Sequence, residues 1–308
     1  MIVVTGASGL LGASVLLHAR DLRLEVAGLC YRHLLCVPGA RVLRVDLTDH
    51  RATQAIIASL QPKIIIHCAA MTNVDWCEDH PSEAEQVNVH AASFLAETAS
   101  NLNAGFVYIS TDSVFDGERG NYSETDKPAP INVYAKSKLC GEHRVLRHHP
   151  STLVVRTNIY GWNVQSKQSL AEWILQRLAE RKQVPGFTDV YFAPMLVNDL
   201  AEILLAMLDR NLTGPYHVVG SERISKYEFA RRLAATFGFE PGRVIATRVA
   251  QVGLRADRPL DISLSTEKVR LALGRAMPDV ESGLRRFRAL YDVGYPQQLK
   301  GYVTGAHK

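Results

Sequence analysis

Tyr134 and Lys138 have the side chains and the spacing that proton transfer requires. They lie four residues apart in a segment, residues 132–147, whose pattern predicts a helix, so both side chains project from one face. A free tyrosine has a pKa of about 10. A neighbouring ammonium group favours the phenolate and lowers that pKa, which lets the phenol exchange a proton at neutral pH.

Thr111 is a third candidate because it ends an apolar run. Residues 106–110 (Phe-Val-Tyr-Ile-Ser) predict a buried strand. Thr111 then lies at the carboxyl end of that strand, where open α/β sheets bind their ligands. We therefore predict Thr111, Tyr134 and Lys138 as the catalytic residues.

A glycine-rich loop near the start of the chain predicts a dinucleotide site. Gly6, Gly9 and Gly12 follow a short apolar strand, Ile2–Thr5, and lead into an apolar helix, residues 11–19. In this order the three glycines permit a tight turn, a close approach of the backbone to a pyrophosphate, and close packing of helix on strand. The free N–H groups of the helix N-terminus favour phosphates. We expect contacts from the three glycines and from Ser8, Leu10 and Leu11.

The end of the second predicted strand, residues 25–29, indicates which dinucleotide binds. A site for NAD usually has an acidic residue here to hold the ribose hydroxyls. This chain has Tyr31 and Arg32 instead. A guanidinium group suits the 2′-phosphate of NADP, so we predict that NADPH is preferred over NADH. The alternative is that Arg32 is an ordinary solvated arginine.

Two further strand ends complete the predicted cofactor site. Asp46 and Leu47 follow the third strand, residues 41–45, and are placed to meet the adenine. Small residues follow the fourth strand, residues 63–67, and would let the cofactor lie against the backbone; they are Cys68, Ala69 and Ala70.

Strands and helices alternate as far as Arg156, with a sixth strand at residues 152–156. Thr48 is placed to cap a helix that runs to about Leu60, and Ser82 with Glu85 resembles a capping box for a helix that ends near Asn103. Alternation of this kind predicts an α/β fold with a Rossmann-type, doubly wound parallel sheet.

After Arg156 the alternation loosens. Residues 216–219 predict a short strand, and helices are expected at residues 169–181, 197–208, 226–237, 266–273 and 280–291. We therefore predict a cofactor-binding domain at 1–156. Residues 157–308 would form mainly a smaller substrate-binding lobe, with some segments that return to the first domain.

Composition excludes several classes of protein. The chain has 308 residues, 47% of them hydrophobic, and a net charge of +4. It contains no block of Lys and Arg, which argues against nucleic acid as a partner. Its five cysteines lack C-x-x-C spacing, as expected of a reduced, cytoplasmic protein. No apolar run approaches the roughly 20 residues of a membrane span, and we expect no signal peptide.

Two groups of polar residues leave alternatives open. His67, Cys68, Cys77 and His80 are close in sequence but lack a recognised ligand spacing, so we predict no metal. Asn88 either supports the loop at Thr111 or is exposed.

Several motifs together resemble the extended short-chain dehydrogenase/reductase superfamily. The glycine loop and the Tyr134/Lys138 pair are typical of the superfamily. The stretch S-T-D-S-V-F-D-G at residues 110–117 is similar to the S-T-D-Y-V-F-D-G signature of dTDP-4-dehydrorhamnose reductases. The resemblance extends over essentially the whole chain. Ser113 stands where the family often has Tyr. The R-T-N-I segment at 156–159 is one residue shorter than the typical R-T-S-W form, and the usual Trp is missing unless Trp162 substitutes for it.

The resemblance implies reduction of the C4 ketone of a nucleotide-linked 6-deoxy sugar by NADPH. Tyr134 would protonate the developing alkoxide, Lys138 would hold the nicotinamide ribose, and Thr111 would hydrogen-bond the carbonyl oxygen. The expected substrate contacts are Thr111, Asp112, Ser113, Asn158 and Arg258. The resemblance leaves the sugar, the nucleotide and a homodimer open.

Two alternatives compete with this interpretation. One is an epimerase or 4,6-dehydratase of the same superfamily, although dehydratases tend to have T-D-E where this chain has Thr111, Asp112 and Ser113. The other is a non-catalytic, NADP-binding subunit that resembles the regulatory subunit of methionine adenosyltransferase.

Overall fold

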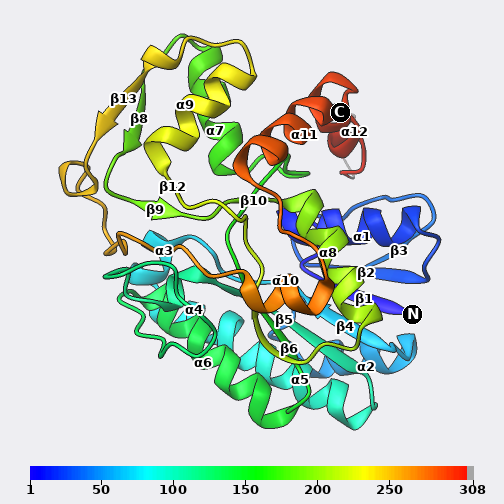
Figure 1. Cartoon of the computed structure of the whole chain (residues 1–308). Coiled ribbons are helices and arrows are strands. Elements are labelled where there is room, and N and C mark those ends of the chain that lie inside the picture. The colour runs from blue at the N-terminus through cyan, green and yellow to red at the C-terminus, as the bar shows by residue number, and fades with distance from the viewer. Residues whose placement is uncertain (304–308) are drawn as a thin grey trace.

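A computed structural model of the chain describes residues 1–303, and a seven-stranded parallel sheet forms its centre (Figure 1). The strand order is β11-β6-β5-β4-β1-β2-β3, and every neighbouring pair is parallel. The strands are β1 (Ile2–Thr5), β2 (Val26–Cys30), β3 (Arg41–Arg44), β4 (Ile64–His67), β5 (Gly105–Thr111), β6 (Leu153–Thr157) and β11 (Gly214–His217). The predicted fold class is confirmed.

The sheet is covered on both faces, which explains why its strands are apolar along nearly their whole length. Successive residues of β1 enter different cores: Val3 packs with Ala92 and Leu95, and Val4 packs with Leu16 and other residues of a second cluster. One face carries α1 (Leu10–Asp21) and α8 (Val197–Asp209), and the other carries α2 (His50–Leu60), α5 (Ala92–Asn101) and α6 (Val133–His148) (Figure 1).

The strand order reverses between β1 and β4. From β1 the chain proceeds to β2 and β3 in one direction, and from β4 it proceeds to β5 and β6 in the other. Ligands of open α/β sheets bind at the carboxyl ends of the strands on either side of such a reversal. The glycine loop follows β1 and residues 68–70 follow β4, so both lie at this point.

A smaller group of elements lies beyond the carboxyl edge of the sheet (Figure 1). Short strands pair there as β8 (Val184–Phe187) with β13 (Val244–Thr247) and as β9 (Tyr191–Phe192) with β12 (Ile224–Ser225). The helices of this lobe are α7 (Leu170–Ala179), α9 (Lys226–Thr236), α11 (Val280–Asp292) and α12 (Tyr295–Gly301). A further pair, β7 (Ile159–Tyr160) with β10 (Met195–Leu196), precedes α8.

Not every segment after residue 156 belongs to this lobe. The short strand expected at residues 216–219 is β11, two residues earlier, and it pairs with β6 in the main sheet. Helix α8 packs against α1, and α10 (Glu267–Leu273) packs against β11.

Two expected helix starts were wrong. Asp49, rather than Thr48, caps α2 by accepting a hydrogen bond from the Ala52 N–H, because Thr48 instead donates to Asp46. Ser82 caps no helix, since Pro81 at the first helical position already begins α4 (Pro81–Glu85). The segment then continues through a π-helical turn, Gln86–Ala91, into α5.

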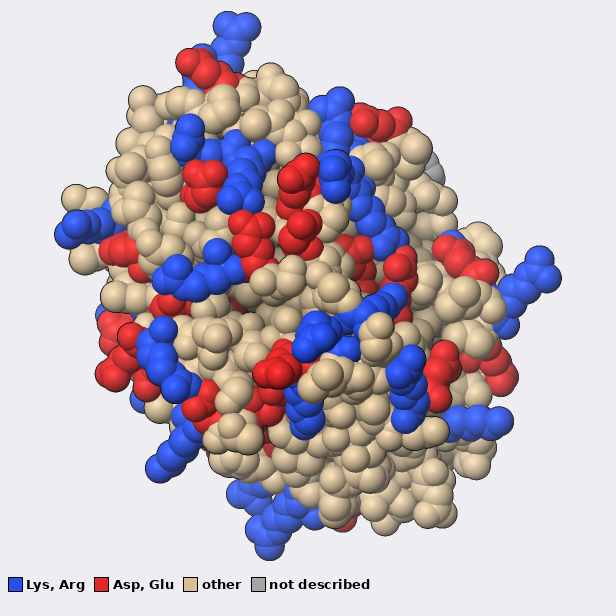
Figure 2. All heavy atoms as spheres, viewed as in Figure 1, with Lys and Arg blue, Asp and Glu red and all other residues tan. Residues whose placement is uncertain are grey.

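The surface and the helices agree with an ordinary globular chain. On the face that Figure 2 shows, acidic and basic side chains are interspersed rather than segregated. None of the helices in residues 1–303 is long and apolar enough to span a membrane.

Candidate active site

The glycine loop is packed as tightly as the sequence predicts at two of its three glycines. Gly6 has a φ of +61°, and a Cβ there would lie 2.7 Å from the Cα of Ala69. A Cβ at Gly12 would overlap the carbonyl oxygen of Gly6. A Cβ at Gly9 would meet only that carbonyl oxygen, at 3.1 Å. The loop is therefore closed toward the protein at Gly6 and Gly12 and open to a ligand at Gly9.

Helix α1 begins at this opening. In the described part of the chain no side chain caps its N-terminus, and no acidic residue occupies its first turn. The N–H groups of the first turn, which includes Leu10 and Leu11, are thus left for an anion. Ser8 is buried beside the loop, where its carbonyl oxygen accepts a hydrogen bond of 2.5 Å from the Gln165 side chain. The residues fit a dinucleotide phosphate.

Tyr31, Arg32 and Asp46 come together at the adjacent ends of β2 and β3. The Arg32 guanidinium lies 5.5 Å from the centre of the exposed Tyr31 ring. Burial raises the pKa of Asp46, but hydrogen bonds from Thr48 and Tyr31 and the charge of Arg32 outweigh it and hold that pKa below its usual value. Leu47 follows, half-buried. Arg32 is exposed to solvent, with the Asp46 carboxylate close by.

Asn88 is buried rather than exposed, and it supports the loop after β4 instead of the loop at Thr111. Its side chain accepts a hydrogen bond of 2.8 Å from the Met71 N–H and donates to the Met71 carbonyl over 3.1 Å. It also donates to the Ser137 hydroxyl over 2.9 Å. The Met71 backbone, which follows the half-buried residues Cys68, Ala69 and Ala70, is thereby linked to helix α6, which carries Tyr134 and Lys138.

Helix α6 starts where its cap and two neighbouring segments meet. The Asn132 side chain accepts a hydrogen bond of 2.9 Å from the Ala135 N–H and donates to the Asp257 carbonyl over 3.0 Å. Glu78, in α3 (Val74–Asp79), accepts from the Val133 N–H at 3.1 Å. The first turn of α6, with Tyr134, is therefore fixed to both the sheet domain and the lobe.

Tyr134 and Thr111 meet within hydrogen-bonding distance at the carboxyl end of β5. Burial raises the pKa of the Tyr134 phenol, the hydrogen bond with Thr111 lowers it, and the charge of Asp112 raises it further. The sequence-based expectation that Lys138 lowers this pKa is not met in the protein alone. The reason is the position of Lys138, whose ammonium is directed elsewhere.

Lys138 is almost completely buried, and its ammonium donates a hydrogen bond of 2.7 Å to the Ile109 carbonyl. The ammonium also lies 4.0 Å from the centre of the Tyr108 ring. Burial lowers the pKa of Lys138 to about 7, although Glu142 opposes the shift. A lysine with such a pKa is close to its titration midpoint at neutral pH, which is unusual outside functional sites.

Asp112 joins Thr111 to the other expected substrate residues. Its carboxylate is 1% exposed and accepts hydrogen bonds from Asn158 at 2.6 Å, from the Thr111 hydroxyl at 3.1 Å and from the Ser113 hydroxyl at 3.2 Å. Burial raises the pKa of Asp112 to about 6, while its hydrogen bonds and the charge of Lys226 oppose that shift. Four of the five expected substrate residues therefore form one cluster.

Arg258, the fifth, is hydrogen-bonded to other residues rather than to this cluster. Its guanidinium donates to the Asp75 carboxylate over 2.9 Å and to the Ala256 carbonyl over 3.0 Å. Its charge also contributes to lowering the pKa of Lys226, which places two cations near each other at the lobe. Lys226 is a residue that the sequence analysis missed, because the first residue of a helix carries no motif.

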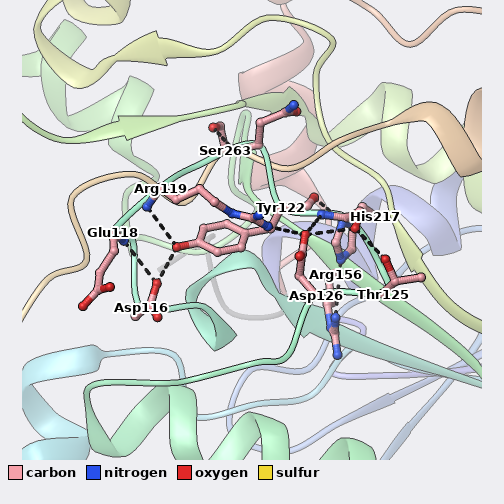
Figure 3. Close-up of polar contacts among 11 residues, drawn as sticks. Asp116, Glu118, Arg119, Tyr122, Thr125, Asp126, Arg156, His217 and Ser263 are labelled. Atoms are coloured by element: carbon pink, nitrogen blue, oxygen red, sulfur yellow. Dashed lines mark hydrogen bonds and ion pairs between the residues drawn. The ribbon is translucent and has the colours of Figure 1, made fainter.

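A second missed feature is a buried polar chain behind β5. The Ser110 hydroxyl donates to Glu142 over 2.5 Å, and Arg156 forms an ion pair of 2.8 Å with the same carboxylate. Arg156 also lies 3.4 Å from a ring nitrogen of His217, whose other ring nitrogen lies 3.0 Å from the Tyr122 carbonyl oxygen (Figure 3). Burial and the Arg156 charge lower the pKa of His217 to about 3. This buried chain of polar contacts fixes the segment between β5 and α6.

The last described residues, up to Val303, also contact segments next to the glycine loop. The Lys300 ammonium donates to the carbonyls of Asn163, at 3.0 Å, and of Gln165, and Gln165 in turn contacts Ser8. The Cys36 N–H donates to the Tyr302 carbonyl over 2.7 Å, next to a bridge between Leu35 and Val303. Within residues 1–303 no group of His, Cys, Asp and Glu side chains is arranged to hold a metal.

Comparison with known proteins places this site in a family. The model of the family described as "RmlD substrate binding domain" matches residues 1–292. The chain belongs to the RmlD substrate-binding domain family. The resemblance to the extended short-chain dehydrogenase/reductases that the motifs indicated is confirmed.

Solved structures of RmlD-type proteins share the fold. A dTDP-4-dehydrorhamnose reductase from Bacillus anthracis, crystallised in complex with NADP, superposes with a TM-score of 0.84 at 29% identity and covers 94% of this chain and 98% of its own. A hypothetical dTDP-4-dehydrorhamnose reductase from Sulfolobus tokodaii gives a TM-score of 0.81 at 34% identity, over 91% of this chain and 98% of its own.

Similar curated proteins have two different kinds of name. One, from Haloferax volcanii, is called a probable low-salt glycan biosynthesis reductase and is 32% identical over 94% of this chain and 97% of its own length. Another is the methionine adenosyltransferase 2 subunit beta of Danio rerio, 34% identical over 88% of this chain and 84% of its own length. The similar curated proteins thus include some with and some without reductase in their names.

Proposed function

We propose that this RmlD-family protein reduces the C4 ketone of a nucleotide-linked 4-keto-6-deoxy sugar with NADPH, as a reductase similar to dTDP-4-dehydrorhamnose reductase. The observation that carries the proposal is the meeting of Tyr134, Thr111 and Asp112 at the carboxyl end of β5, beside the buried Lys138. A phenol held by a hydroxyl at a ligand-binding sheet edge is suited to donate a proton to a developing alkoxide.

NADPH, when bound, supplies the hydride. The loop at Gly9 and the N-terminus of α1 would hold its pyrophosphate, and Arg32 would hold its 2′-phosphate. Tyr134 donates the proton that the sugar oxygen needs. Lys138, which lies on the same helix face, would contribute an ammonium group for the ribose hydroxyls.

The substrate end of the site has a matching distribution of charge. Lys226 and Arg258 lie near each other on the lobe, and two adjacent cations favour an anion such as the diphosphate of a nucleotide sugar. Asn158 and Ser113 surround Asp112 and offer amide and hydroxyl groups to sugar hydroxyls.

A non-catalytic, nucleotide-binding subunit is the second candidate, since the chain is 34% identical to a methionine adenosyltransferase subunit beta. An epimerase or dehydratase fits less well. Dehydration would use a second acidic side chain after Asp112, and Ser113 supplies only a hydroxyl. Exchangeable NADPH also fits Arg32 better than a tightly held, recycled NAD.

One assay separates these candidates. The protein is mixed with NADPH and with dTDP-, UDP- or GDP-linked 4-keto-6-deoxy sugars, and NADPH oxidation is followed by absorbance, with Tyr134→Phe as the matched control. A reductase oxidises NADPH only when a sugar nucleotide is present, and the control is slow. Binding of NADPH without oxidation by any of these sugars would favour the non-catalytic subunit.

A further inference from the structure

The hydroxyl of Thr111 lies between two acidic groups. On one side it is within hydrogen-bonding distance of the Tyr134 phenol, and on the other it donates to the Asp112 carboxylate over 3.1 Å. A hydroxyl can accept one proton while it releases another, so Tyr134, Thr111 and Asp112 form a continuous path for a proton.

The path ends at a carboxyl group that is set apart from solvent. Asp112 is 1% exposed, and Asn158 and Ser113 hold it in place. Ser113 is half-buried, and its hydroxyl, 3.2 Å from the carboxylate, connects Asp112 to the surface. Tyr134, by contrast, must give up a proton in every reduction and needs a source that replaces it.

We propose that Asp112 is that source: it returns a proton to the Tyr134 phenolate through the Thr111 hydroxyl after each reduction. This inference rests on the proposed reductase function and adds a role for Asp112 beyond substrate contact. Thr111 is then the middle member of the relay, because its hydroxyl, which donates to Asp112 in the protein alone, passes the proton on to the phenolate.

The proton balance of the cycle is complete. Hydride addition to the carbonyl carbon produces an alkoxide, and the phenol O–H bond of Tyr134 breaks as the new sugar O–H bond forms. The phenolate takes the Thr111 hydroxyl proton while Thr111 takes the carboxyl proton of Asp112. The Asp112 carboxylate is finally protonated from water by way of Ser113.

The charges around Asp112 suit a carboxyl group that titrates near neutral pH. Burial raises its pKa to about 6, and Lys226, at the start of α9, opposes that rise. The Tyr134 phenol, on α6, also faces the Asp112 carboxylate. The charge of Arg258 acts on Lys226, which in turn acts on Asp112. An acid with this pKa can donate to a phenolate and recover its proton from water in each cycle.

The pH dependence of kcat tests the relay. Wild-type kcat should fall as the pH rises through about 6, because the protonated form of Asp112 is the donor. Asp112→Asn keeps the shape of the side chain and should lose this falling limb of the kcat–pH profile. Its kcat should be about tenfold or more lower than that of the wild type on the acid side. Lys226→Met should move the limb to higher pH, because the opposing charge is gone. Asp116→Asn, the same change in the same loop, should leave the limb in place.

A second variant keeps the relay testable even if Asp112→Asn fails to fold. Thr111→Val retains the carboxyl group but interrupts the path, so it should lose the same limb. The double variant should be no slower than either single one, since the residues act as a unit. Retention of the limb in Asp112→Asn, or additive losses in the double variant, would overturn the relay.

A titration without sugar separates failure of the relay from failure of the reductase. The carboxyl carbon of Asp112 is followed by carbon-13 NMR against pH, with Asp112→Asn for assignment. If the path exists, Tyr134→Phe shifts the pKa of Asp112 in the wild-type background and leaves it unchanged in Thr111→Val. That result supports the proton link even if no nucleotide sugar is reduced, and the absence of any shift contradicts it.

Discussion

The ammonium group of Lys138 donates a hydrogen bond to the carbonyl oxygen of Ile109, 2.7 Å away, and not to the phenol one helical turn earlier. In the protein alone, therefore, this lysine is anchored to strand β5. Burial has lowered its pKa from 10.5 to about 7. This relationship leads to a prediction about stability as well as catalysis.

Lys138→Met should change the pH dependence of unfolding. Because the folded pKa is below the unfolded one, the unfolded chain binds more protons between pH 7 and 10.5, so the wild type gains stability as the pH rises through that window. The variant lacks this rise. Urea unfolding at pH 7 and pH 10 measures it; an equal rise in both proteins would mean that Lys138 is not buried as a partly neutral amine.

Tyr134→Phe removes one hydroxyl and should leave the fold and NADPH affinity unchanged. If Tyr134 is the proton donor, kcat should fall by about 10²–10⁴-fold, with a smaller effect on KM, because the lost interaction belongs to the transition state. Tyr227→Phe, on α9 of the lobe, serves as the control. A variant that reduces a nucleotide sugar at the full rate would contradict the proposed mechanism.

Arg32→Ala should weaken NADPH binding and leave NADH binding nearly unchanged. A charge-assisted contact with a phosphate contributes about 1.5–3 kcal/mol, which corresponds to roughly tenfold or more in Kd. Arg51→Ala, an exposed arginine on α2, is the matched control. Fluorescence titration gives both affinities, and equal affinity of the wild type for the two cofactors would refute the preference.

Arg258→Ala should raise KM for the sugar nucleotide while cofactor affinity stays the same. Arg255 offers an unusually close control, because it pairs with Asp79 of α3 over 2.8 Å much as Arg258 pairs with Asp75 over 2.9 Å. Arg255→Ala should leave KM unaltered. Equal increases in the two variants would indicate that the ion pairs hold the lobe against α3 and that neither arginine binds the diphosphate.

Glu142→Ala should destabilise the protein strongly, because it leaves the guanidinium of Arg156 buried without its partner. Loss of one member of a buried ion pair costs about 3–5 kcal/mol. Glu281→Ala, which breaks an exposed pair with Arg285, should cost about 1 kcal/mol or less. Denaturant unfolding compares the two variants. Similar losses of unfolding free energy would argue against a structural role for the buried polar chain behind β5.

The sequence predicted the parts of the site that depend on local patterns. The glycine loop, the Tyr134/Lys138 spacing and the end of β5 are each contained in a few residues whose geometry is set by the helix or the strand. Their meeting at one sheet edge follows from the parallel topology. The fold class could therefore be stated before the structure was known.

What the sequence did not predict depends on contacts between distant segments. Nothing near Asn88 indicates that it holds the Met71 loop, and Lys226 reaches Asp112 from a different lobe. Ser82 illustrates the opposite error, a local capping motif that is not used because the helix begins at Pro81, with His80 two positions before Ser82 as its N-cap. The direction of the Lys138 ammonium was also beyond prediction, since it depends on a carbonyl 29 residues away.

The contacts of Lys300 with residues 163–165, and of Gln165 with Ser8, have a consequence for biosynthesis. A ribosome makes the glycine loop long before it makes Lys300. The nascent chain can pair its first strands early, yet the loop that supports Ser8 receives its anchor only after residue 300 has emerged from the exit tunnel. A nucleotide that needs this support would therefore be captured by chains that have grown well past residue 300 and not by shorter ones.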